Sequence, residues 1–184
     1  MASGISVYLP PELIVTPNGM AGNGTNQPDM ATMLRGVYTL GNTPMIFNAM
    51  LPKSVEEFKP EVRQQFEHYA EVYKTFIRPM LPTCKVYHHA PVNATGGVES
   101  GKWLAMEYGS PDKKKGWATI IRLADGDPNI IFKPRGLAAE KMYRVTFDNT
   151  GKTEMIKGSQ LMKNGCALRV TDNVRSELLL FEAR

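Results

Sequence analysis

Short apolar runs separated by turn-forming residues fill the chain from residue 103 to residue 182. These runs are rich in aromatic and β-branched side chains, which favour strands. The predicted strands cover residues 103–108, 117–123, 130–132, 142–147, 153–156, 166–170 and 177–182. Seven short strands at roughly ten-residue spacing predict a small antiparallel β-sandwich or barrel.

Turn residues connect these runs. The polar loop 109–116 contains Pro, Asp and Gly and predicts a hairpin, as does the segment 148–151. Residues 137–141 are predicted to form a single helical turn, and residues 159–163 a short helix that ends at Asn164-Gly165.

The first 28 residues follow a different pattern. Two short strands are predicted at residues 5–9 and 13–15, and Pro10-Pro11 ends the first of them. A long run of Gly, Asn, Thr and Pro residues follows at residues 16–28. Loops of this length inside a domain are usually functional or disordered.

Two helices are predicted between the loop and the strands. Asp29 is placed to cap a helix that runs to Leu40 and ends at Gly41. A capping box at residues 54–57 and Pro60 precede a second helix over residues 60–78. Its apolar stripe consists of Val62, Phe66, Tyr69, Tyr73 and Phe76. We expect this stripe to lie on a core that the chain supplies only in part.

Composition sets limits on the function. A chain of 184 residues holds one domain, or two if one of them is small. The net charge of +4 is mild, and the only basic run, residues 113–115, lies in a predicted loop, so no nucleic-acid partner is expected. No apolar run reaches the ~20 residues of a membrane span, and residues 1–4 lack the features of a signal peptide, so no membrane partner is expected and the localisation stays open.

The sequence contains no self-sufficient catalytic or metal-binding pattern. Two cysteines, Cys84 and Cys166, form neither a disulfide framework nor a metal motif. His88 and His89 are adjacent, and neighbouring residues of a strand point to opposite faces, so a shared metal with His68 is not predicted. The acidic residues fall at caps, on helix surfaces or in turns, without the carboxylate pair that glycoside hydrolysis needs. We therefore predict no catalytic residue, no metal and no cofactor.

Several motifs nevertheless resemble one enzyme family. They are the segments 73–78, 86–87 and 103–108, followed by Pro134-Arg-Gly-Leu137, Tyr143-Arg-Val145, Gly158-Ser-Gln-Leu-Met162, Gly165 and Ser176-Glu-Leu-Leu179. Together they are similar to the C-terminal region of melibiase-type (clan D) α-galactosidases. The Pro-rich stretch Tyr8-Leu-Pro-Pro11 with Pro17-Asn18 resembles the segment that follows the acid/base aspartate of that family.

This resemblance implies an α+β fold. Residues 1–80 would be a helical and loop segment resembling the last segments of a TIM barrel, and residues 81–184 a C-terminal antiparallel β-sandwich. The catalytic aspartates of the family lie N-terminal to anything in this chain, so the resemblance implies a non-catalytic tail that is inactive alone. Thr16-Pro17 stands where the family often has a histidine, which leaves the sugar specificity of the parent enzyme open.

Two further interpretations remain. A carbohydrate-binding module would use exposed rings, with Trp103, Trp117, Tyr108 and Tyr143 as candidates, although such rings more often belong to a sheet core. The candidate substrate-binding residues are Asn18, Trp103 and Trp117. An oligomerisation module would use apolar surface on residues 28–78. The expected partners are accordingly carbohydrate, the missing part of the barrel or a second copy of the chain.

Overall fold

A computed structural model describes residues 15–18, 29–41, 43–46, 59–89, 103–122 and 127–184. The predicted strand at residues 5–9 and the capping box at residues 54–57 lie outside this described part. None of the helices that the structure describes has the length and apolarity needed to cross a membrane.

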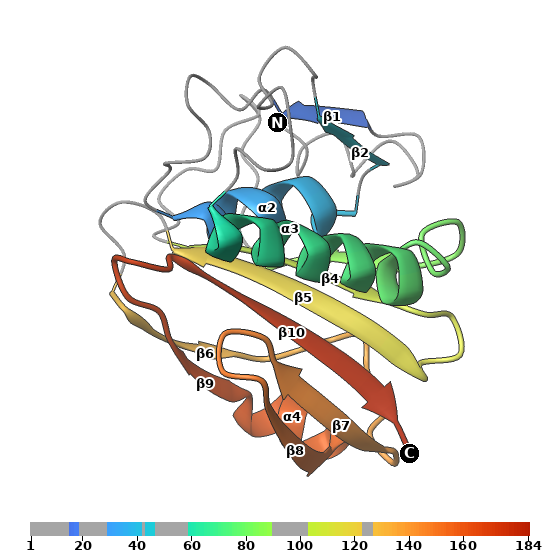
Figure 1. Cartoon of the computed structure of the whole chain (residues 1–184). Coiled ribbons are helices and arrows are strands. Elements are labelled where there is room, and N and C mark those ends of the chain that lie inside the picture. Colours follow the sequence, from blue (N-terminus) through green and yellow to red (C-terminus); the bar gives the residue numbers. More distant parts are fainter. Residues whose placement is uncertain (1–14, 19–28, 42, 47–58, 90–102, 123–126) are drawn as a thin grey trace, which may run out of the picture.

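A six-stranded antiparallel sheet forms the centre of the fold (Figure 1). Its strands lie in the order β3-β4-β5-β10-β7-β8. Their bounds are Lys85–His88, Trp103–Gly109, Lys115–Arg122, Ser176–Ala183, Met142–Phe147 and Lys152–Lys157. The C-terminal strand β10 therefore pairs with both β5 and β7 and joins two hairpins into one sheet.

The two faces of this sheet carry different layers. Figure 1 shows α2 and α3 over one face and the small elements β6, β9 and α4 on the opposite side. The strands β6 (Asn129–Phe132) and β9 (Cys166–Arg169) form an antiparallel pair, and α4 covers Gly158–Asn164. The predicted α+β class with an antiparallel β region is confirmed.

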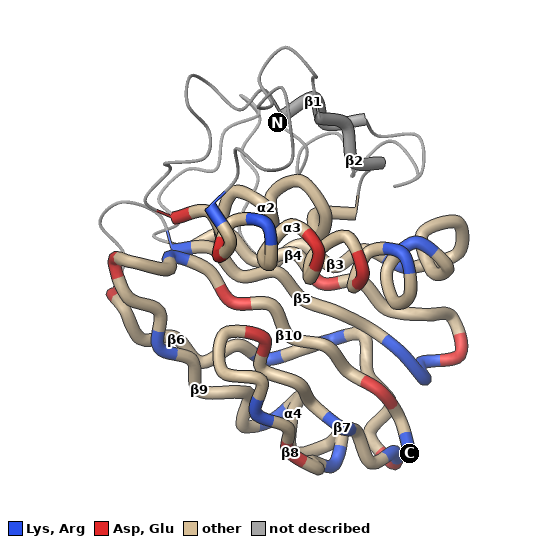
Figure 2. Tube along the Cα trace, viewed as in Figure 1, with Lys and Arg blue, Asp and Glu red and all other residues tan. Residues whose placement is uncertain are grey.

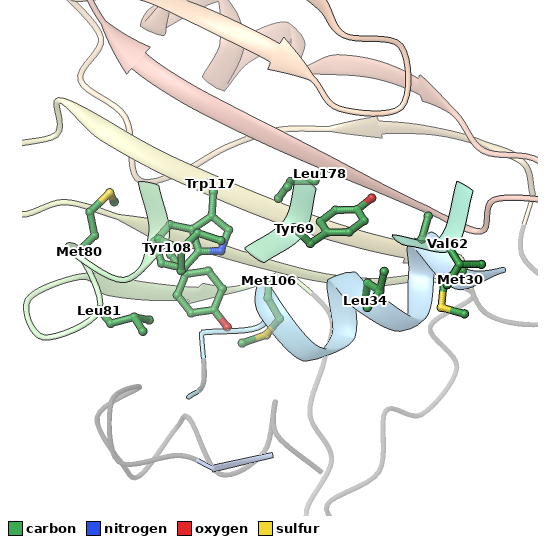
Figure 3. Close-up of a cluster of buried hydrophobic side chains, with 12 residues drawn as sticks. Met30, Leu34, Val62, Tyr69, Met80, Leu81, Met106, Tyr108, Trp117 and Leu178 are labelled. Carbon is green, nitrogen blue, oxygen red and sulfur yellow. The ribbon is translucent and has the colours of Figure 1, made fainter. Parts of the chain in front are cut away.

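The helical layer packs on the sheet of this same chain. Helix α2 covers Met30–Tyr38, and the side chain of Asp29 accepts a hydrogen bond from the Thr32 N–H at 3.0 Å, as predicted for its cap. Helix α3 covers Pro60–Val72 and continues as the π-helical turn η5 over Tyr73–Ile77. Buried residues of both helices share one core with the sheet residues Met106, Tyr108, Trp117 and Leu178 (Figure 3). The apolar stripe of α3 was expected to lie on a core that the chain supplies only in part. In the structure, the sheet of the same chain packs against this stripe.

Two stacked rings attach the end of α2 to the sheet. Tyr108 and Trp117 have no exposed surface, and their ring centroids lie 4.4 Å apart with planes 10° from parallel (Figure 3). The Tyr108 hydroxyl donates to the Leu40 carbonyl, and Trp117 Nε1 donates to the Thr39 carbonyl. Gly41 follows with a φ of +66°, and a Cβ there would lie 2.2 Å from the Tyr108 ring. Glycine is therefore required for this close approach.

Packing on the opposite face of the sheet accounts for several of the sequence motifs. Leu137, Tyr143, Val145 and Leu161 are buried in a second core between the sheet and the small β6–β9 pair. A Cβ on Gly136 would lie 2.8 Å from the Tyr87 ring. Gly165 caps α4 with a φ of +80°. These motif positions serve packing and backbone conformation.

The elements β1 and β2 precede the sheet. Strand β1 (Val15–Asn18) pairs in parallel with β2 (Thr43–Ile46), and the helix α2 lies between them in sequence. Parallel pairing requires such a crossover connection. The order β1-α2-β2-α3 is therefore a repeated β/α unit.

The structure differs locally from the predictions in three places. Residues 137–141 form bends and a turn rather than a helical turn, because Tyr143 and α4 hold their backbone groups. Strand β3 was not predicted, since it contains four residues without clear alternation. Strand β1 covers Val15–Asn18 and so extends into the predicted loop 16–28, while residues 13 and 14 of the predicted strand lie outside the described part.

Replacing Gly158 by Ala tests the packing of α4. A Cβ on Gly158 would lie 2.0 Å from the Ala138 carbonyl oxygen, which is backbone and cannot rotate away. We expect Gly158→Ala to lower the free energy of unfolding by about 2–3 kcal/mol in urea denaturation. The control Gly151→Ala meets no atom within 4 Å and suffers only from its φ of +66°, so about 1 kcal/mol is expected. Equal losses for both variants would contradict the proposed clash.

Candidate functional site

A buried guanidinium joins α2 to the sheet. The side chain of Arg35 is 1% exposed, and its Nη2 donates to Asp148 Oδ2 at 2.6 Å and to Asn149 Oδ1 at 2.8 Å. Its Nη1 donates to the Ser176 carbonyl at 2.7 Å. Three segments that are far apart in sequence, namely α2, the β7–β8 turn and the start of β10, therefore meet at one charge.

Helix α3 contributes to the same cluster. His68 Nε2 lies 2.6 Å from Asp148 Oδ1, and the Tyr69 hydroxyl donates to Asp148 Oδ2 at 3.1 Å. The Arg35 guanidinium also lies over the Tyr69 ring, 5.5 Å from its centroid. These residues line an open pocket of about 400 Å³ together with polar side chains of α3.

The surroundings shift the pKa values of Asp148 and Glu177 in opposite directions. Burial tends to raise the pKa of Asp148, but the hydrogen bond from His68 and the charge of Arg35 outweigh it and hold the pKa below its usual range. The hydrogen bond to Asp148 raises the pKa of His68 against the opposing effect of burial. Burial raises the pKa of Glu177, which lies 3.8 Å from Arg35 Nη2.

Asp148 and Glu177 nevertheless do not form a glycosidase pair. Asp148 lines the pocket beside α3, whereas Glu177 lines a separate cavity among strands β7, β8 and β9. Two carboxylates that act on one glycosidic bond must flank the same space. In the part of the chain that the structure describes, these two acids cannot do so.

A second polar cluster is structural. Glu107 is 1% exposed and accepts hydrogen bonds from the backbone N–H groups of Arg135 at 2.8 Å and Gly136 at 2.7 Å. His89 Nε2 lies 2.7 Å from Glu107 Oε2, the oxygen that also accepts from the Arg135 N–H. The carboxylate thus anchors the loop after β6 to β4.

The histidines occupy different environments. His68 contacts Asp148 and His89 contacts Glu107, while the carbonyl of His88 accepts from Arg135. Among the described residues no group of three or more His, Cys, Asp or Glu side chains is arranged to hold a metal ion. Burial raises the pKa of the Cys166 thiol to about 12, which leaves it unreactive at neutral pH.

The structure distributes the three candidate substrate-binding residues over different places. Trp117 has no exposed surface, and its ring face is stacked on Tyr108. Tyr108 and Tyr143 also have no exposed surface, so these three rings are core residues and offer no face to a sugar. Trp103 begins β4 and packs, partly buried, against the second core. Asn18 is the last residue of β1, paired with Ile46, and its side chain lies outside the described part.

Asn18 occupies the position in a β/α unit where TIM barrels carry active-site residues. It stands at the carboxyl end of a parallel strand. In a TIM barrel this end of the strands carries the active site. The structure does not bring Asn18 together with Trp117 at one site.

The Arg35 cluster is not predicted by any pattern in the sequence. The sequence feature that marks Arg35 is that it lies on the apolar face of its helix, four positions after Ala31 and one after Leu34. Acids that pair with it come from distant segments, which a helix pattern does not identify. Elsewhere on the trace, Lys and Arg are interspersed with Asp and Glu (Figure 2).

Comparison with solved structures identifies the fold. The chain is similar to the galactosidase domain of the α-galactosidase-sucrose kinase AgaSK, with a TM-score of 0.66 at 19% identity over 100% of this chain and 24% of that one. It is similar to the GH36 α-galactosidase AgaB from Geobacillus stearothermophilus, with a TM-score of 0.59 at 14% identity over 92% of this chain and 21% of that one. An α-amylase from Geobacillus thermoleovorans gives a TM-score of 0.57 at 10% identity over 92% of this chain and 39% of that one.

By sequence, no family model and no characterised protein matches. At these identities the structural likeness shows the fold alone. The chain spans about a quarter of the length of the AgaSK galactosidase domain, and it has the fold found in the C-terminal part of GH36 α-galactosidases.

Replacing Arg35 by Met tests whether its charge holds the layers together. The substitution leaves the buried acids Asp148 and Glu177 without their cation, so we expect the free energy of unfolding to fall by about 3–5 kcal/mol. The control Arg63→Met removes an ion pair with Glu67 whose side chains are 57% and 64% exposed, and a change within about 0.5 kcal/mol is expected. Urea titrations of both variants measure the difference, and similar midpoints would contradict this role of Arg35.

The pH dependence of unfolding tests the contact between His68 and Asp148. Because the pKa of His68 is raised in the folded state, its stabilising contribution is complete below the ordinary value of about 6.5 and is lost as the pH rises through the folded-state pKa. We expect the stability difference between the wild type and His68→Gln to shrink over this range. The effect is small because the His68 side chain is 49% exposed.

The wild type and His68→Gln both contain Glu177, so the titration of Glu177 cancels in the stability difference between them. The Asp148 contribution has the opposite sign and is lost only as the pH falls below about 3.9, through the lowered pKa of that group. A stability difference that grew between pH 6.5 and pH 8.5 would be incompatible with the assigned contact.

Proposed function

We propose that this chain is the C-terminal portion of an α-galactosidase-like glycoside hydrolase. Its first part, residues 1–80, corresponds to the last two β/α units of a TIM barrel, and residues 81–184 form the β domain that follows. The order β1-α2-β2-α3 with parallel β1 and β2 carries this proposal. It is supported by a structural likeness to the AgaSK galactosidase domain that extends over the whole chain.

The Arg35 cluster fits the junction between these two parts. Arg35, His68 and Tyr69 belong to the first part, whereas Asp148 and Ser176 belong to the second. In some proteins buried polar or ionic contacts give the fold its specificity, and we assign this role to the Arg35 cluster at the junction. We infer that the β domain supports the end of the barrel in a fixed position.

The proposed role of this portion is non-catalytic. Within the described residues the buried acids Asp148 and Glu177 open to separate cavities, and Glu107 is occupied by backbone N–H groups. The remaining barrel would supply the catalytic aspartates. Asn18, at the carboxyl end of β1, is the candidate through which this chain contacts a sugar in the complete barrel.

A two-stranded parallel sheet is incomplete as a barrel. An eight-stranded barrel surrounds its core only when every strand has two neighbours. We therefore assign the preceding barrel strands, rather than a second copy of the chain, as the partner of β1 and β2. The oligomerisation interpretation loses its main support, because the buried faces of α2 and α3 already pack on the sheet.

An assay of the chain alone tests the absence of a catalytic pair. We expect the purified chain to release no nitrophenol from 4-nitrophenyl α-galactoside, with the β-anomer and the α-glucoside as controls. Turnover that persisted through repeated purification would show that a carboxylate pair exists in this chain and would refute the proposed role.

A chimera tests the positive side of the proposal. The chain replaces the matching C-terminal quarter of the AgaSK galactosidase domain, and hydrolysis of the α-galactoside is compared with that of the truncated domain. We expect higher activity from the chimera and a loss of that gain in its Arg35→Met version. A folded chimera no more active than the truncated domain would contradict the proposal.

A further inference from the structure

A second cavity lies inside the β region. Its volume is about 350 Å³, and its walls come from β8, β9, the end of β7 and the start of β10. Figure 1 shows β9 next to the β7–β8 hairpin. Small-molecule sites have volumes of about 300–1,000 Å³, so the cavity has room for one ligand of monosaccharide size.

A buried carboxylate with unused acceptor capacity lines this cavity. Glu177 is 5% exposed, and its Oε1 accepts hydrogen bonds from the backbone N–H groups of Asn149 at 2.9 Å and Leu178 at 3.0 Å. Its Oε2 accepts no hydrogen bond from any residue in the described part of the chain. Oε2 is accessible from the cavity rather than fully buried, so it can accept a hydrogen bond from a ligand that brings a donor.

The charges around the cavity exclude a strongly ionic ligand. Lys152 and Arg169 are cationic, Glu154 and Glu177 are anionic, and all four line the cavity. Lys152 Nζ and Glu154 Oε1 form an ion pair of 2.6 Å. Arg35 lies 3.8 Å from Glu177 and compensates that carboxylate from outside the cavity. The two positive and two negative side chains around the cavity favour a neutral ligand. A cationic ligand beside Glu177 would be repelled by the charge of Arg35.

The walls add apolar surface. Phe147, Ile156 and Leu168 line the cavity and belong to the second core or pack against it. A ligand must therefore combine an apolar face with several hydroxyl groups. Pyranose sugars have this combination, with C–H groups on one face that contact aromatic rings and hydroxyls at the rim.

We propose that this cavity is a binding site for a neutral hydroxylated ring, such as a monosaccharide or the terminal residue of a glycan. One hydroxyl donates to Glu177 Oε2, the ring lies against Phe147, and the Lys152 ammonium at the rim donates to a further hydroxyl. The site is proposed to bind without hydrolysis, because Glu154, the second carboxylate of the cavity, is held in an ion pair by Lys152 at 2.6 Å. It does not depend on the function proposed above, because all of its residues belong to the β region.

Amide chemical shifts of the full chain measure this binding. The probes are methyl α-galactopyranoside as the sugar, myo-inositol as a polyol ring without a glycosidic carbon, and n-butylammonium as the cation. We expect saturable shifts at the residues of β8 and β9 with the sugar, with a dissociation constant of about 1–10 mM. Equal binding of inositol would place recognition in the hydroxyls alone, in support of the stated ligand class.

Three variants locate the site. Glu177→Gln keeps the size of the side chain and an acceptor for the Asn149 N–H but loses the carboxylate charge, so binding should weaken about tenfold. If this variant does not fold, Lys152→Ala remains as a test at the rim, where a weakening of about threefold is expected. Its matched control, Lys157→Ala, lies on the same strand outside the cavity and should bind the sugar as the wild type does.

Three outcomes would overturn the proposal. The first is the absence of saturable shifts at about 50 mM sugar, and the second is shifts confined to residues outside the cavity. The third is tighter binding of n-butylammonium than of either polyol, which would assign the site to cations.

Discussion

The burial of the Arg35 guanidinium is the constraint on which the arrangement of the layers depends. A charge removed from water must find partners, and Arg35 finds them on the β7–β8 turn and at the start of β10. These contacts fix the position of α2 and, through Asp148, that of α3. The packing of Tyr108 and Trp117 under the end of α2 then completes the layer.

The central sheet separates two environments that are linked by this one charge. On the helical face, Asp148 is held ionised and takes part in a network of side chains. On the opposite face, burial raises the pKa of Glu177, which lines a cavity between strands. Adjacent residues of a strand point to opposite faces, so Ser176 and Glu177 of β10 connect the network with the cavity. The two acids are therefore close to the same arginine without sharing a space.

The function proposed above assigns this arrangement a supporting role in a larger enzyme. Several of the sequence-motif residues serve packing: Gly136 lies against Tyr87, Gly158 lies against the Ala138 carbonyl, and Leu161 is buried. The likeness to an α-amylase shows that such an architecture accompanies different activities.

The sequence by itself determined the local elements. The alternation in β7, the cap at Asp29 and the turn glycines Gly151 and Gly165 follow from backbone propensities that act over a few residues. Only the tertiary structure decided that β10 lies between β5 and β7, that Trp117 is buried in the core, and that Arg35 meets Asp148 across 113 positions of sequence. The physical reason is that strand pairing and charge pairing depend on which surfaces meet, and many pairings of distant segments satisfy the same local pattern.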